Sequence, residues 1–251
     1  MKPAERIFLP LASVAFAGLA VWGWQAIADA QLVSRVFLPG PDRAWDALMR
    51  GFARGDLIPD IGATVWRMTL GWLLASAIGV GIGAVIGVSA TARAYFGPAL
   101  EFLRPLPASA IVPVAIALFG LTNEMVLGVI AFGTVWPMLL ATVQGFASVE
   151  PRLYEVARVL GFSQAQVIRK IALPSALPDI LSGMRVGITV ALILSIVGEM
   201  LTSQPGLGLR ILLAARAFNS ADLYAGVILL GVIGILSSLL IDVLERAWKR
   251  G

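Results

Sequence analysis

Long apolar stretches alternate with short polar connections along the whole chain. Six stretches stay apolar over roughly the 20 residues that a helix needs to cross a bilayer, and they cover residues 7–28, 64–88, 99–119, 124–146, 180–201 and 223–244. The pattern therefore predicts an all-α integral membrane protein with six transmembrane helices. These form one domain over residues 1–251, with the core spans between about residues 64 and 244.

The first apolar stretch has features of a signal peptide, because Lys2 and Arg6 precede it. It is long enough to span a bilayer, however, and it lacks a convincing cleavage site of small residues. We therefore interpret it as a retained transmembrane helix. Six spans in total place both termini on the same side of the membrane.

The lysine and arginine residues indicate which side that is. If both termini are cytoplasmic, the inner connections carry eleven of these residues and the outer ones six, while Arg67 and Arg185 lie within spans. Cytoplasmic loops usually carry the excess of basic residues, so this orientation is favoured. It makes 147–179 a long cytoplasmic connection and places 29–63 and 202–222 outside, where apolar residues at helical spacing predict short surface helices.

The connection 147–179 has a helical pattern of its own. Pro151 suits the first turn of a helix, and Gly161 is typical of the residue that ends one. The apolar residues between them share one face, which predicts a short amphipathic helix. Such a helix can present an apolar ridge to a groove in a partner, or it can lie on the inner leaflet with Arg169 and Lys170 near anionic lipid.

A second short helix is predicted directly after the first. Ser163 and Gln166 have the spacing of a capping box, in which each side chain binds the backbone N–H of the other residue. We expect this helix to end near Leu173, because Pro174 has no N–H and its ring restricts the preceding residue. The two helices would form a compact cytoplasmic elbow.

Composition excludes most enzyme classes. The chain is 59% hydrophobic and 14% charged, which does not suit a soluble domain, and it contains no cysteine and no histidine. No phosphate-binding G-x-x-x-x-G-K-[ST] sequence occurs, so ATP chemistry would have to come from another chain. We expect no cofactor, no metal site and no catalytic residue; an intramembrane enzyme would need a Ser–Lys or diaspartyl pair, and no suitable pair is visible.

The connection 147–179 resembles the EAA loop of bacterial ABC importer permeases. That pattern reads Glu-Ala-Ala, three residues, Gly, nine residues and Ile-x-Leu-Pro, and the matching positions are Glu155, Ala157, Gly161, Ile171, Leu173 and Pro174. The one departure is Val156, which stands where the pattern has its first alanine. The wider chain is similar to the nitrate, sulfonate and taurine group of these permeases in three stretches, namely Phe37-Leu38-Pro39-x-Pro41, Leu103-Arg104-Pro105-Leu106-Pro107 through Pro113, and Gly198-Glu199 followed by Gly206-Leu207-Gly208.

The resemblance implies a permease subunit in the bacterial inner membrane. It implies cytoplasmic ATP-binding subunits that dock on the EAA loop, an extracytoplasmic substrate-binding protein and a second permease copy, as a homodimer. The solute would be a small anion such as a sulfonate, taurine or nitrate. The alternative is a secondary transporter driven by an ion gradient, although most acidic residues lie in loops and no internal repeat is evident.

Small residues recur every four positions in two of the predicted spans. Gly79, Gly83 and Gly87 form one such series, and Gly183 with Gly187 forms another. Small residues at this spacing let helix backbones approach closely. We therefore expect helix packing from these glycines, not contact with the solute.

Three residues within the spans are candidates for lining a translocation path. Pro113 belongs to the predicted span 99–119, where it, Pro105, Pro107 and the adjacent Pro98 cannot all fit a regular helix, and interrupted helices at membrane depth often line a pathway. Arg185 and Glu199 are ionisable and lie fourteen positions apart, or about 21 Å along a helix, which is too far for a direct pair. Snorkelling toward the two membrane surfaces is the alternative explanation for both.

Overall fold

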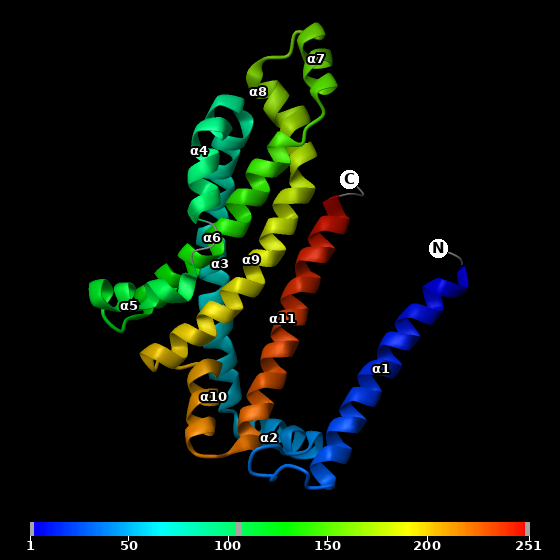
Figure 1. The fold of residues 1–251 in the computed structure, drawn as a ribbon, viewed down its shortest axis with the longest axis vertical. Coiled ribbons are helices and arrows are strands. Elements are labelled where there is room, and N and C mark those ends of the chain that lie inside the picture. Colours follow the sequence, from blue (N-terminus) through cyan, green and yellow to red (C-terminus); the bar gives the residue numbers. More distant parts are fainter. Residues whose placement is uncertain (1–2, 104–106, 249–251) are drawn as a thin grey trace.

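The computed structural model describes residues 3–103 and 107–248, without the side chains of residues 3–11, Ser109 and Trp248. These residues form helices and turns and no strand (Figure 1). The helices are α1 (Pro3–Asp29), α2 (Pro41–Arg54), α3 (Leu57–Val88), α4 (Ala90–Leu103), α5 (Ala108–Phe119), α6 (Asn123–Ala147), α7 (Pro151–Val159), α8 (Gln164–Val167), the π-helix η1 (Ile168–Ala172), α9 (Leu173–Thr202), α10 (Leu207–Arg216) and α11 (Ser220–Trp248).

Helix α6 forms the centre of the fold, between α3 and α9. The glycine series predicted from the sequence faces it on both sides. A Cβ atom at Gly83 would lie 2.8 Å from the carbonyl oxygen of Leu139, and one at Gly183 would lie 2.8 Å from that of Pro137. These backbones are too close for any side chain, which confirms the expected packing role of the glycines.

Four helices in the described part of the chain are long and apolar enough to cross a membrane. They are α3, α6, α11 and the continuous helix Gln164–Thr202, which includes α9. Helix α1 covers the first predicted stretch with 27 residues and diverges from α11 away from its contact with α2 (Figure 1).

The third predicted span, over 99–119, is not one regular helix, as its prolines indicate. Helix α4 ends at Leu103, and α5 starts again at Ala108 after Pro107, which has the extended backbone of an N-cap. Proline at this position supplies no N–H to a helix, so the chain changes direction there. Arg104 and Pro105 lie outside the described residues.

The two ends of the molecule carry different short helices. Helices α7 and α8 lie at one end, called here the α7 end, and α2 and α10 lie at the other, called the α10 end (Figure 1). The surface helices expected in the connections 29–63 and 202–222 are therefore present as α2 and α10. Both amphipathic helices pack against α11, with residues such as Leu48 and Ile211 buried.

Close packing of α3 on α6 gives a testable expectation. We expect Gly83→Val to lower the apparent melting temperature of the purified protein by several degrees, because its Cβ would lie 2.7 Å from the Cβ of Thr142. Such overpacking costs about 1–3 kcal/mol. Gly81→Val is the matched control, since a Cβ at Gly81 meets nothing within 4 Å. Equal melting temperatures for the two variants would contradict this packing.

Candidate functional site

The first helix of the EAA segment ends as its glycine predicts. Gly161 adopts φ +65°, a left-handed conformation that glycine tolerates best. The N–H of Phe162 donates to the carbonyl of Ala157 at 2.9 Å, and the N–H of Gly161 donates to that of Arg158 at 3.1 Å. This pair of bonds is the Schellman motif, which satisfies the carbonyls at the end of α7.

The predicted capping box is also present. The backbone N–H of Ser163 donates to the side chain of Gln166 at 2.8 Å, and the N–H of Gln166 donates to the hydroxyl of Ser163 at 3.4 Å. Helix α8 therefore begins immediately after α7 ends. The two short helices form the elbow that the sequence indicates, beyond the ends of α6 and α9 (Figure 1).

The prediction that Pro174 stops the second helix is wrong. The chain stays helical from Gln164 to Thr202, with the π-helical turn η1 between α8 and α9. In η1 the N–H of Leu173 donates to the carbonyl of Ile168, five residues back. The wider turn places Pro174 at the start of α9, where a missing N–H is tolerated. A continuous helical connection therefore links the elbow to α9.

The EAA residues divide into an exposed group and a supporting group. Glu155 is exposed and forms no ion pair within the described part of the chain, whereas Ala157 on the same helix is only 1% exposed. Exposed apolar side chains stand beside Glu155, namely Val156, Val159 and Leu160. Ile171, Leu173 and Pro174 lie at the base, where the elbow joins α9.

A cavity of about 540 Å³ lies between α5, α6 and α9. Its lining is mostly apolar and contains no charged side chain. The residues around it are Ala108, Gly133, Trp136, Pro137, Leu140, Ala141, Ser182, Gly183, Val186 and Val190. The cavity can hold a small solute at the depth of the long helices. Among the described residues, no group of His, Cys, Asp or Glu could hold a metal ion.

None of the three predicted path residues lines this cavity. Pro113 is exposed on α5. Arg185 forms ion pairs from α9 to Asp242 and to Glu245 of α11, the latter at 2.6 Å. Glu199 is fully buried. Their role in the path stays a prediction.

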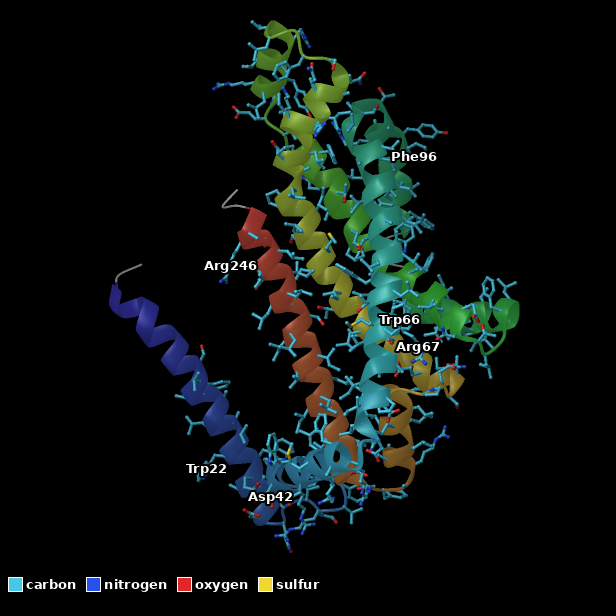
Figure 2. All side chains as sticks on the ribbon, turned by 180° about the vertical axis from the view of Figure 1, so that it is seen from behind. Trp22, Asp42, Trp66, Arg67, Phe96 and Arg246 are labelled. Carbon is cyan, nitrogen blue, oxygen red and sulfur yellow. The ribbon has the colours of Figure 1, made fainter. Side chains whose placement is uncertain are left out.

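Glu199 has a partner that the sequence did not reveal. Nη1 of Arg67 on α3 lies 2.8 Å from Oε1 of Glu199 on α9, and the two side chains are 8% and 0% exposed. Nε of Arg67 also donates to Oδ1 of Asn123, the first residue of α6, at 2.7 Å. Figure 2 shows Arg67 beside the exposed Trp66 on α3. The pair therefore joins α3, α6 and α9.

A second ionic cluster at the α10 end lies nearer the surface. Arg210 of α10 pairs with Asp60 at 3.1 Å and with Asp56 at 3.2 Å. Partial burial alone would lower the pKa of Arg210, but hydrogen bonds to these two carboxylates raise it above its ordinary value. Arg210 therefore stays charged, in ion pairs with the start of α3 that are partly exposed to solvent.

Comparison with known proteins shows the family to which the chain belongs. Residues 76–250 match the family described as "Binding-protein-dependent transport system inner membrane component". A Bacillus subtilis permease whose name assigns it to aliphatic sulfonates is 31% identical over 98% of this chain and 89% of its own length. The taurine transport system permease protein TauC of Escherichia coli is 29% identical over 89% of this chain and 83% of its own length.

Nitrate import permease protein NrtB of Leptolyngbya laminosa is 27% identical over 94% of this chain and 86% of its own length. Among solved structures, a chain of the MetNI methionine ABC transporter in an inward-facing conformation superposes with a TM-score of 0.67 at 19% identity. The match covers 76% of this chain and 95% of that one, and it shows the shared fold. The chain therefore belongs to the binding-protein-dependent ABC transporter permeases, the non-catalytic multi-pass inner membrane components that work with ATP-binding subunits and a substrate-binding protein.

Proposed function

We propose that this permease imports a small anion, such as a sulfonate, taurine or nitrate, as one half of a homodimer. The observation that carries the proposal is the exposed apolar ridge of α7 on an elbow joined without a break to α9. If the ridge served only to pack within the permease, it would be buried. Val159, which belongs to the ridge, is instead 87% exposed. ATP-binding subunits would dock on this ridge and on Glu155.

The translocation path would run along the cavity between α5, α6 and α9. Small residues such as Ala108, Gly183 and Ala141 leave room there, and Ser182 adds a hydroxyl. A second copy facing this cavity would complete the path. Helix α1 and the α4–α5 pair would then raise the number of crossings to six, with both termini in the cytoplasm.

Relatives with similar sequences support an anion as the solute. Their names assign them to sulfonates, taurine and nitrate, which are small anions or zwitterions. The cavity has no charged lining residue that would favour one of them. Selection among them would therefore fall mainly to the substrate-binding protein.

Uptake by reconstituted liposomes tests the proposed function. Vesicles would contain the chain with the ATP-binding subunit that co-purifies with it, and taurine, ethanesulfonate and nitrate would be offered with the binding protein encoded beside it. We expect uptake of one of these anions at least tenfold above that of vesicles without ATP. Uptake by the chain alone, driven by an ion gradient, would instead support the secondary transporter.

A further inference from the structure

The buried Arg67–Glu199 pair does more than neutralise two charges, because it also holds the start of α10. Oε2 of Glu199 accepts a hydrogen bond from the N–H of Gly208 at 2.8 Å. Nη1 of Arg67 donates to the carbonyl of Pro205 at 2.8 Å. The first turn of a helix has unpaired N–H groups, and a carboxylate there is favoured by the helix dipole. Glu199 therefore caps α10 from another helix.

Thr64 extends these contacts within α3. Its hydroxyl donates to Oε2 of Glu199 at 3.0 Å and accepts from the N–H of Leu207 at 2.9 Å. Thr64, Glu199 and the side chain of Leu207 are each 0% exposed. Breaking the network would leave several polar groups unpaired in an apolar interior, which is costly.

Two glycines let the start of α10 approach this carboxylate. A Cβ at Gly206 would lie 2.4 Å from Oε2 of Glu199, and one at Gly208 would lie 2.5 Å from the carbonyl oxygen of Ile196. Gly206 also has φ +155° and ψ 178°, a conformation that is essentially restricted to glycine. The contact between α10 and α9 therefore depends on the absence of side chains at Gly206 and Gly208 as well as on the charge of Glu199.

Helix α9 connects this contact to the elbow at the other end of the molecule. It runs unbroken from Leu173, beside η1, to Thr202. Glu199 lies 26 residues after Leu173, which is roughly 39 Å along a helix. A displacement of the elbow therefore acts on one continuous helix, and Glu199 lies near its far end.

We propose that Arg67 and Glu199 are positioning residues that fix α10 to α9, so that movement of the α7–α8 elbow reaches the α10 end of the permease. This inference rests on the proposed function, in which ATP-binding subunits move the elbow. Helix α10 then follows α9 in each transport cycle. In this role Glu199 acts through α10, because its carboxylate is fully buried against the start of that helix.

Cysteine labelling tests this role, since the chain contains no cysteine of its own. Ala214 on the packed face of α10 is 8% exposed, and its neighbour Leu213 is 53% exposed. Ala214→Cys and Leu213→Cys would be labelled with a hydrophilic maleimide in nanodiscs holding the complex with its ATP-binding subunit, before and after vanadate trapping of ATP. We expect slow labelling of the cysteine at 214, with a rate that trapping changes several-fold.

Adding Glu199→Gln should speed labelling at position 214 at least tenfold and remove its dependence on trapping, without changing labelling at 213. Gly206→Ala should do the same without removing a charge, because its Cβ would displace the carboxylate. Arg210→Gln is the matched control, since its ion pairs are partly exposed, and we expect a change below twofold.

Wild-type labelling rates and a wild-type response to trapping in both Glu199→Gln and Gly206→Ala would overturn the positioning role. The proposed function fails in a different way, namely if the unaltered chain retains no ATP-binding subunit. If it retains the subunit but its labelling at position 214 does not respond to trapping, the positioning role is overturned instead. In either case, the labelling rates at position 214 in Glu199→Gln and Arg210→Gln, measured without trapping, still show whether the Arg67–Glu199 pair holds α10.

Discussion

Glu155→Lys is expected to reduce ATP-dependent uptake at least tenfold in a permease that still inserts and folds. Glu155 is exposed on α7 beside the apolar side chains of Val156 and Val159, and it forms no ion pair in the described structure. Reversing its charge therefore leaves the permease intact but opposes docking. Charges at the rim and centre of an interface decide which partner binds.

Retention of the ATP-binding subunit during affinity purification is the direct measurement. Glu124→Lys is the matched control. Glu124 carries the same charge and is exposed, but it lies in the first turn of α6, at the end of that helix away from α7. We expect it to retain the subunit at the wild-type level. Normal retention and normal uptake by Glu155→Lys would show that α7 does not form the docking surface.

The same outcome is expected of Gly161→Asp, for a different reason. Gly161 has φ +65°, and its surroundings leave room for a side chain. Asparagine and aspartate both tolerate this conformation, but aspartate adds a negative charge at a helix C-terminus, where the dipole disfavours it. Gly161→Asn therefore separates the charge from the backbone effect, and we expect it to retain most of the uptake.

Local signals explain why the elbow could be predicted in detail. The glycine at 161 and the pair Ser163 and Gln166 act within one or two turns, and the structure contains the bonds that they predict. The prediction that the second helix ends before Pro174 is wrong, because a proline does not always end a helix. Its cost depends on the geometry of the preceding turn, and a π-helix there was not visible in the sequence.

Contacts between distant residues explain what the sequence did not show. Arg67 and Glu199 are 132 positions apart, so no periodicity connects them. The signal that could have found the pair is the presence of two opposite charges in separate apolar stretches, since such charges rarely remain unpaired. The third predicted span shows the same limit. Its four prolines, at 98, 105, 107 and 113, are visible in the sequence, but the position at which α5 begins is not.

Blocking the cavity between α5, α6 and α9 should stop transport in a reversible way. Ser182 lines this cavity, and Ser182→Cys changes its volume little, so the variant should import as the parent does. Treatment with benzyl methanethiosulfonate would then place an aromatic group in the path. We expect uptake to fall at least fivefold and to recover when dithiothreitol removes the group.

The recovery separates obstruction from misfolding, because a misfolded permease would not regain activity on reduction. Leu239→Cys is the control, since Leu239 is 51% exposed on α11 and lies outside the lining of the cavity. Its modification should leave uptake within twofold of the untreated value. Complete modification of the cysteine at 182 with unchanged uptake would place the path elsewhere. An excess of the transported anion should slow the modification of that cysteine, because solute and reagent would compete for the same cavity.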